Sequence, residues 1–213
     1  MTRGILIECS RKEEWILPWW WSKYTKFNRY PVAFIDVNLS LRAQVWCQAR
    51  GNWIPLNASL SPAKNRYKPL VLSQTLFEET ISIDLHCEVV ASLTPLFDKI
   101  HAHSKIGFSK SPSLALKPIH YDLSVIPYHR DSPLLKRWGE LCTSSGILKA
   151  DESDLLHAII HEESVEIVEL PCKFNWKVQA GVNLEAIILH WPGKWGRKVL
   201  KREVLSYPFL LKS

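Results

Sequence analysis

The chain has 213 residues and a formal net charge of +6, from 27 lysines and arginines against 21 acidic residues. Hydrophobic residues make up 46% of it, enough for a packed core, which excludes a mainly disordered chain. No apolar run approaches the roughly 20 residues that a membrane-spanning helix needs, so we expect no transmembrane span and a cytoplasmic location.

The charge and the cysteines narrow the class of protein. A basic balance favours anionic partners at long range, which leaves nucleic acid, phosphorylated metabolites and anionic lipid headgroups open. The five cysteines are scattered and form no Cys-x-x-Cys pair, so neither a zinc ribbon nor a disulfide framework is indicated. Eight glycines against ten tryptophans argue against a glycine-rich phosphate loop and for extensive aromatic packing.

Strands and helices alternate from the start of the chain. The apolar run Gly4 to Cys9 predicts a strand, and Glu14 to Tyr24 predicts a helix that Pro18 kinks or restarts. Pro31 to Asp36 then reads as a second buried strand that ends in an acid. A helix capped by Ser40 follows.

The alternation continues beyond a polar loop around Ser61. Lys68 to Thr80 has helical character, and Ile81 to His86 reads as a further strand with an acid near its carboxyl end. This pattern predicts an α/β fold with a mainly parallel central sheet flanked by helices, in one domain over residues 1–213. Asp36, Asp84 and the carboxyl end of the first strand should then share one edge of that sheet.

The second half is less regular, and a basic tail follows it. Short strands are expected over Ile106 to Phe108, Leu123 to Ile126, Val165 to Leu170 and Glu185 to His190, and helices over Pro133 to Cys142 and Ser153 to His161.

One stretch carries metal-binding chemistry. Alternation along a strand would place Asp84, His86 and Glu88 on one side, near the crevice where α/β sheets usually bind ligands. A carboxylate favours Mg²⁺ or Mn²⁺, and an imidazole shifts the preference toward Mn²⁺. The alternative is a strand-end acid beside a solvated or hydrogen-bonded histidine.

Four motifs together resemble a known family. Residues 83–89 (Ile-Asp-Leu-His-Cys-Glu-Val) look like the Asp-x-Asp segment of family 8 glycosyltransferases, which have the GT-A fold. Tyr121 to Ile126 lies where the family has an Asn-x-Gly strand, and Glu152-Ser153-Asp154 where it has an Asp-Gln-Asp helix start. His190-Trp191-Pro192-Gly193 is similar to the late His-x-x-Gly motif. The motifs occur in the family's order, and the resemblance spans roughly residues 4–198.

The resemblance implies an activity and a cofactor. It implies transfer of a sugar, with retention of configuration, from a nucleotide sugar such as a uridine diphosphate sugar to an unknown acceptor. Mn²⁺ or Mg²⁺ would be held by Asp84, His86 and His190 and would bridge the diphosphate. Because His86 supplies an imidazole where the family has a carboxylate, Mn²⁺ is expected to serve better than Mg²⁺.

The resemblance also assigns donor contacts. Glu152 and Ser153 take the positions of the Asp-Gln pair that contacts the donor sugar, so they are the predicted catalytic residues, and Asp84 and Gly193 are predicted to contact the donor. The family's diphosphate-binding lysine falls on Gly196, so Lys194 or Arg197 is expected to replace it. These departures leave a second function open, that of a catalytically inactive module that binds a nucleotide sugar or a phosphate.

Three further signals have two interpretations each. His157 and His161 share a helix face and either chelate zinc or edge an amphipathic helix. Trp19 to Trp21 either touch a membrane peripherally or pack against the sheet. The basic stretch from Lys194 to Arg202 lacks a nucleic-acid-binding motif, so we expect a solvated tail that partly serves the diphosphate and no nucleic-acid partner.

Overall fold

The computed structural model describes residues 2–56, 67–100, 105–110, 121–144, 151–163 and 165–204. The polar loop expected around Ser61 lies outside these ranges. The longest helix within them, α7 (Gly193–Val204), has 12 residues, and none of the described helices is both long and apolar enough to cross a bilayer.

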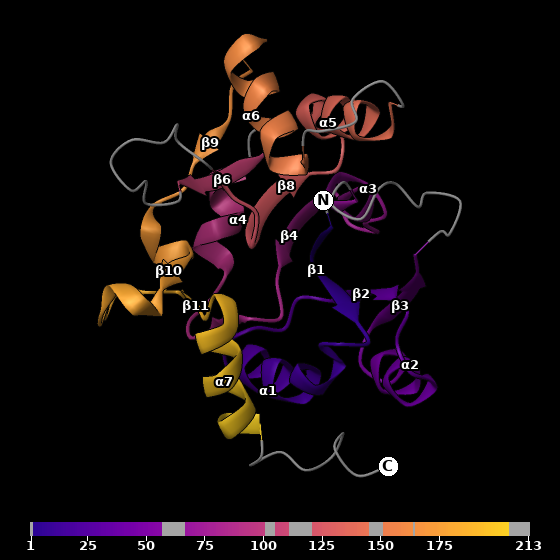
Figure 1. The fold of residues 1–213 in the computed structure, drawn as a ribbon, viewed down its shortest axis with the longest axis vertical. Coiled ribbons are helices and arrows are strands. Elements are labelled where there is room, and N and C mark those ends of the chain that lie inside the picture. The colour runs from indigo at the N-terminus through magenta and orange to yellow at the C-terminus, as the bar shows by residue number, and fades with distance from the viewer. Residues whose placement is uncertain are drawn as a thin grey trace.

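A five-stranded sheet in the order β3-β2-β1-β4-β8 forms the centre of the molecule (Figure 1). β1 (Arg3–Ser10) pairs in parallel with both β2 (Val32–Val37) and β4 (Glu79–Ile83). β3 (Asn52–Pro55) pairs in parallel with β2, and β8 (Val125–His129) is antiparallel to β4. The predicted mainly parallel central sheet is therefore confirmed.

The parallel strands end at one edge of this sheet. Asp36 on β2 lies opposite Cys9 on β1, and Asp84 directly follows β4, which runs in the same direction as β1. The prediction that Asp36, Asp84 and the end of the first strand share an edge is confirmed. The Asp36 carboxylate, however, is fully used by the fold, because it accepts hydrogen bonds from Leu39 N, Gln44 Nε2 and Trp53 Nε1.

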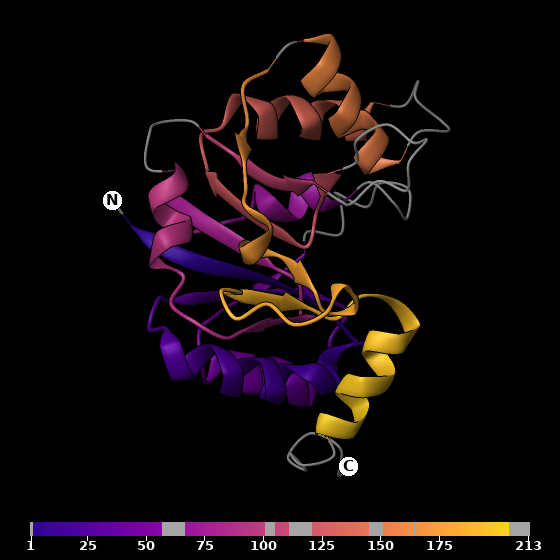
Figure 2. The same ribbon diagram turned by 90° about the vertical axis from the view of Figure 1, so that its left-hand side faces the viewer.

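Helices cover both faces of the sheet, as the edge-on view shows (Figure 2). α1 (Leu17–Phe27) and α2 (Leu41–Gln48) lie on one face. α3 (Lys68–Leu72), α5 (Pro133–Thr143) and α6 (Glu152–Glu162) lie on the other. The molecule is thus a layer of strands between two layers of helices, which matches the predicted fold class.

The alternation of side chains along β1 supplies both cores. Ile5 and Ile7 are buried in the core on the α1 side, which also receives α4 (Thr94–Ile100). Leu6, between them in sequence, is buried in the core formed with α5 and α6. A strand covered on both faces is apolar at successive positions, which is why Ile5, Leu6 and Ile7 form a continuous apolar run.

Two three-stranded sheets and three short 3₁₀ helices complete the described fold. β11 (Ile188–His190) is antiparallel to β5 (Cys87–Val89), with His190 opposite Cys87. The late histidine motif therefore lies beside the segment that follows Asp84. One sheet has the order β10 (Trp176–Lys177), β11 (Ile188–His190) and β5 (Cys87–Val89). The other has the order β7 (Tyr121–Asp122), β6 (Gly107–Lys110) and β9 (Val168–Glu169). The 3₁₀ helices are Glu14–Ile16, Cys172–Phe174 and Val178–Ala180.

Two predicted elements around β4 were too long. The helix expected over Lys68 to Thr80 ends at Leu72, because Thr80 belongs to β4 and pairs with Gly4 of β1. The strand expected to reach His86 ends at Ile83. There the chain turns, with Cys87 N donating to Asp84 O at 2.9 Å, so the alternation that would place three polar side chains together stops.

Glu88 consequently leaves the predicted cluster. It is buried in β5, where one carboxylate oxygen lies 2.6 Å from Lys23 Nζ and the other accepts a hydrogen bond from Trp191 Nε1. The expectation that it lies beside Asp84 and His86 on one strand face is therefore wrong.

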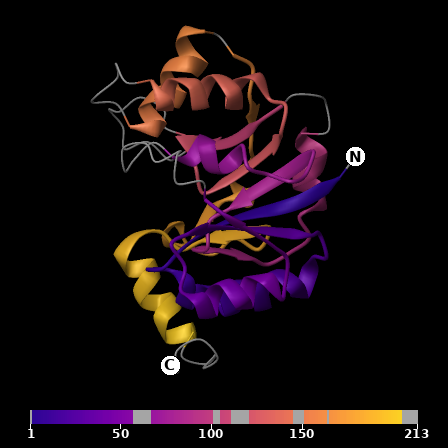
Figure 3. The same cartoon turned by 90° about the vertical axis from the view of Figure 1, so that its right-hand side faces the viewer.

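The basic stretch near the C-terminus is a helix, contrary to the expected solvated tail. Leu200 and Val204, four residues apart, are buried in the core shared with α1, and α7 lies against α1 in the view of Figure 3. Its cations occupy the opposite, exposed face. Trp19 and Trp20 are also buried, so the packing interpretation of the tryptophan run is confirmed for these two residues.

Two glycine substitutions test the packing with opposite signs. A Cβ at Gly51 would lie 2.3 Å from the carbonyl oxygen of Val32, so Gly51→Ala should destabilise the fold by about 1 to 3 kcal/mol. Gly139 lies inside α5 with open space around it, so Gly139→Ala should stabilise the fold by roughly 0.4 to 1 kcal/mol. Urea unfolding of both variants measures the difference. A Gly51→Ala midpoint equal to that of the wild type would contradict the close approach.

Candidate functional site

A polar cavity of about 280 Å³ opens at the carboxyl edge of the central sheet. It lies between the end of β1, the turn after β4 and the first turn of α6, the position at which α/β sheets usually bind ligands. Four carboxyl groups and two cations are among the side chains around it. Its lining residues are Glu8, Glu13, Tyr67, Lys68, Asp84, Leu85, His86, Leu123, Ser124, Glu152 and Arg197.

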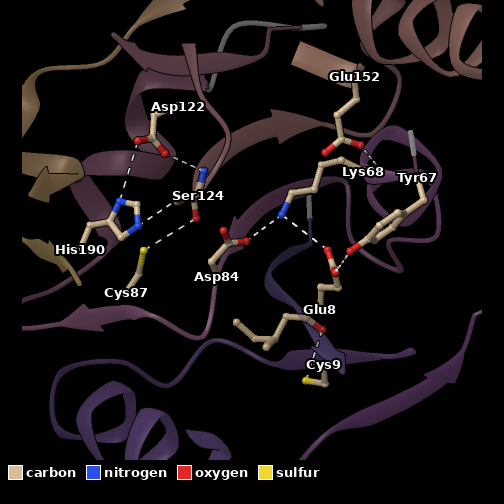
Figure 4. A network of polar contacts seen from close by, with 11 residues as sticks. Glu8, Cys9, Tyr67, Lys68, Asp84, Cys87, Asp122, Ser124, Glu152 and His190 are labelled. Carbon is tan, nitrogen blue, oxygen red and sulfur yellow. Dashed lines mark hydrogen bonds and ion pairs between the residues drawn. The ribbon is translucent and has the colours of Figure 1, made fainter. Parts of the chain in front are cut away.

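The ammonium group of Lys68 is central to this cavity (Figure 4). Lys68 is 5% exposed, and its Nζ lies 2.8 Å from Asp84 Oδ1 and 3.7 Å from Glu8 Oε2. Burial alone would lower the pKa of Lys68, but the charges of Asp84 and Glu8 raise it above its ordinary value. Lys68 therefore carries a positive charge at neutral pH. Tyr67 completes the group by donating to Glu8 Oε1 at 2.7 Å.

Sequence reasoning missed Glu8, Tyr67 and Lys68. A signal was present for two of them, because Glu8 interrupts the apolar run of β1 and Lys68 opens the apolar segment Lys68–Leu72, all of which is buried. A charged residue is rarely buried unless it is paired. Two such residues of opposite charge at the ends of buried elements thus pointed to a pair, although nothing in the sequence indicated that they meet.

Glu152 enters the cavity from the start of α6. Its Oε2 accepts a hydrogen bond from the backbone N of Lys68 at 2.9 Å, and its carbonyl oxygen accepts one from Trp138 Nε1 at 2.8 Å. Burial raises the pKa of the Glu152 carboxyl to about 7, although the contact with Lys68 acts in the opposite direction. Glu152 is therefore a carboxyl group that gains or loses a proton near neutral pH.

Ser153, predicted beside Glu152, has a structural contact. Asp151 caps α6, and its carboxylate accepts hydrogen bonds from the backbone N of both Ser153 and Asp154. This capping fixes the first turn of the helix and with it the position of Glu152. Ser153 is not among the residues that line the cavity, so its contact with a donor sugar stays a prediction.

The two histidine motifs lie side by side in the fold. Trp191 N donates to His86 O at 3.0 Å, so the late motif is joined directly to the turn after Asp84. The imidazoles nevertheless have separate partners. His86 Nε2 lies 3.3 Å from Arg197 Nε, which donates to it, whereas His190 Nε2 lies 3.5 Å from Ser124 Oγ. Burial lowers the pKa of both histidines, so both are neutral at pH 7.

The side chains do not form a metal site as they are arranged. Across the described ranges, no three His, Cys, Asp or Glu side chains are placed to hold one metal ion. The Asp84 carboxylate contacts the Lys68 ammonium, and the His86 imidazole accepts from Arg197, so both lie beside a positive charge. This donor set does not fit a divalent cation, and the predicted ligand set Asp84, His86 and His190 stays a prediction.

Arg197 is the α7 cation that reaches the cavity. A Cβ at Gly196, where the related family has its diphosphate lysine, would lie 2.1 Å from the carbonyl oxygen of Trp191, so no side chain fits there. The next residue, Arg197, lines the cavity and places Nη2 2.8 Å from Glu13 Oε1. Lys194, the other predicted substitute, is exposed and does not line it. Gly193 begins the helix with a φ of +69°, a conformation that favours glycine.

The two histidines that were considered as zinc ligands lie outside the cavity. His157 and His161 lie on α6 with ring centroids 4.1 Å apart. Neither of them lines the cavity, although Glu152 on the same helix does. No third side chain of the described ranges joins them in a metal-binding group.

The raised pKa of Glu152 makes stability depend on pH. Between its ordinary value of 4.5 and the value of about 7 in the fold, the unfolded chain has lost the proton that the folded chain keeps. Unfolding therefore becomes easier as pH rises through this window, by about 3 kcal/mol. Glu152→Gln removes this penalty, so the variant should exceed the wild type in stability at pH 8 but not at pH 4. Urea unfolding at both pH values measures it, with the exposed Glu162→Gln on the same helix as control, and a difference independent of pH would contradict the assignment.

Comparison with known proteins addresses the fold. No protein-family model and no curated protein matches this sequence. Among solved structures, the galactosyltransferase LgtC in complex with donor and acceptor sugar analogs has a TM-score of 0.69 and 13% identity, with 95% of each chain covered. The apo form of the glycosyltransferase GlyE from Streptococcus pneumoniae has a TM-score of 0.68 and 11% identity, with 98% of this chain and 63% of that chain covered.

A third similar structure is the bifunctional glycosyltransferase WbbM, with a TM-score of 0.59 and 11% identity. It is matched over 91% of this chain and 46% of its own, so the chain spans less than two thirds of both GlyE and WbbM and nearly all of LgtC. The chain therefore has the GT-A fold of glycosyltransferases such as LgtC and GlyE.

Proposed function

We propose that the polar cavity binds a nucleotide sugar, with a uridine diphosphate sugar as the donor, and that the protein transfers the sugar to an acceptor hydroxyl with retention of configuration. One observation carries the proposal. In a glycosyltransferase fold, Asp84, Glu152, Lys68 and Arg197 surround one cavity at the carboxyl edge of the sheet. The unit that acts is proposed to be one GT-A domain over residues 1–213, in the cytoplasm.

The chemistry of these groups suits the two halves of such a donor. A diphosphate is an anion with many acceptor oxygens, and the guanidinium of Arg197 and the ammonium of Lys68 are donors with a fixed charge. Sugar hydroxyls donate to carboxylates, which Asp84 and Glu152 provide. The cavity therefore offers cations for the diphosphate and carboxylates for the sugar within one space.

Transfer would break the bond between the anomeric carbon and the diphosphate oxygen, which keeps the electron pair. The acceptor oxygen bonds to the same carbon, and its proton passes to the departing diphosphate. Positive charge near the oxygen that departs stabilises the transition state, which is the role proposed for Arg197 and Lys68. Glu152, with a pKa of about 7, is able to hold or release a proton beside the donor sugar. No step is assigned to a metal ion, since the predicted ligands have other partners.

A specific observation favours a second candidate function. The carboxylate of Asp84, which the resemblance places at the reacting diphosphate, is held in an ion pair by the buried ammonium of Lys68. A module that binds a nucleotide sugar without turning it over needs the cavity but no freely available carboxylate. The same protein would then bind the donor and release it unchanged.

Binding and turnover separate these candidates. We expect a uridine diphosphate sugar from a nucleotide-sugar panel to raise the melting temperature, since a ligand at 100 times its dissociation constant adds about 2.7 kcal/mol of stability. Asp84→Asn should weaken binding and transfer at least tenfold, whereas Glu185→Gln, an exposed glutamate distant from the cavity, should change neither. Binding without release of the sugar would support the inactive module. A panel in which no nucleotide sugar shifts the melting temperature or is turned over would contradict both candidates.

A further inference from the structure

Two of the residues expected to bind a metal ion in this cavity already contact positively charged side chains. Lys68 Nζ lies 2.8 Å from Asp84 Oδ1, and Arg197 Nε lies 3.3 Å from His86 Nε2. Asp84 and His86 are the two polar residues of the motif that resembles Asp-x-Asp. Each of them therefore faces a cation that belongs to the chain itself.

The Lys68 ammonium is held rigidly in place. Its side chain is 7% exposed and lies between carboxylates from two strands, and its backbone N donates to Glu152. Removing a buried ammonium from such partners leaves charges unpaired, which is strongly unfavourable. A divalent cation bound to the Asp84 carboxylate would lie close to this ammonium, and the two positive charges would repel each other at short range.

Arg197 is positioned differently, since it can move. Its side chain is 57% exposed, and it contacts Glu13 as well as His86. A guanidinium on the rim of a cavity can turn from these contacts to the two oxygens of a phosphate, to which it donates in a bidentate manner. The close contact of Gly196 with Trp191 fixes the helix backbone beside the cavity, so Arg197 needs only to change its side-chain conformation.

We propose that Lys68 and Arg197 provide the positive charge that the diphosphate needs, and that this protein binds a nucleoside diphosphate without a divalent cation. The inference rests on the proposed function, because it concerns the same cavity. The resemblance implies a divalent cation as the cofactor. The inference departs from this expectation because Lys68 and Arg197 already contact the expected metal ligands Asp84 and His86.

The charge balance of the cavity is compatible with this inference. Four carboxyl groups and two cations line it. Burial raises the pKa of both Glu8 and Glu152, and for Glu152 it reaches about 7, so Glu152 carries only part of a negative charge near neutral pH. The remaining carboxylates, Asp84 and Glu13, each lie within 3 Å of one of the two cations. The cavity is therefore not the strongly negative site that would require a divalent cation to bind an anion.

Titration of uridine diphosphate into the full chain by calorimetry tests the inference. The titration is run in EDTA, in MnCl₂ and in MgCl₂ at the same ionic strength. We expect dissociation constants that differ by less than tenfold among the three. Binding that is at least tenfold tighter with either metal than in EDTA would overturn the inference and leave the proposed function intact. Absence of binding in all three conditions would overturn both.

Two neighbouring variants test the role of Arg197 with the same loss of charge. Arg197→Gln should weaken binding in EDTA at least tenfold. Lys198→Gln, the next residue on α7, which is exposed and does not line the cavity, should weaken it less than twofold. Equal affinities of the two variants would overturn the assignment of Arg197.

Lys68 requires a variant that keeps the fold. Lys68→Met leaves two carboxylates without their cation, so its folding is checked by circular dichroism before titration. Lys68→Arg retains the charge and should bind uridine diphosphate in EDTA more tightly than Lys68→Met. If Lys68→Met does not fold, an Arg197→Gln variant that binds as tightly as the wild type in EDTA would still overturn the inference.

Discussion

The ion pair between Lys68 and Asp84 connects separate helices and strands of this fold at one edge of the central sheet. Lys68 begins a short helix on one face of the sheet, and Asp84 directly follows β4, the strand beside the central strand β1. The same ammonium lies 3.7 Å from Glu8 at the end of β1, and the backbone N of the same residue donates to Glu152 at the start of α6. One residue thus fixes the relative positions of two strands and two helices at the edge where the cavity opens.

Buried charge of this kind stabilises only when it is complete. Desolvation of the buried Lys68 ammonium costs several kcal/mol, and its attraction to Asp84 and Glu8 repays this cost only with good geometry. The 2.8 Å contact with Asp84 and the hydrogen bond from Tyr67 to Glu8 provide that geometry. The network consequently positions polar groups precisely, and this precision, rather than added stability, is the property that a binding site needs.

Local sequence was sufficient for the parallel core of the fold and for the order of the motifs. The apolar runs before Asp36 and Asp84 identified the two strands that pair with β1, because buried parallel strands are apolar throughout. It was insufficient where a contact distant in sequence decides the structure. The turn at His86 depends on a hydrogen bond between Cys87 and Asp84 and on pairing with β11. The pairing of Lys68 with Glu8 joins residues 60 positions apart, and no local pattern records it.

The close approach of Gly196 to Trp191 restricts how this chain could change over time. Because a side chain at position 196 would collide with a backbone carbonyl, one substitution cannot introduce a lysine there unless α7 also shifts. On a helix the next position is rotated by about 100° and advanced by about 1.5 Å. A cation at Arg197 therefore approaches the cavity from a different direction than one at 196 would. A cation at position 196 and one at position 197 are therefore two different arrangements. Changing this chain from the second to the first would pass through a variant that packs poorly.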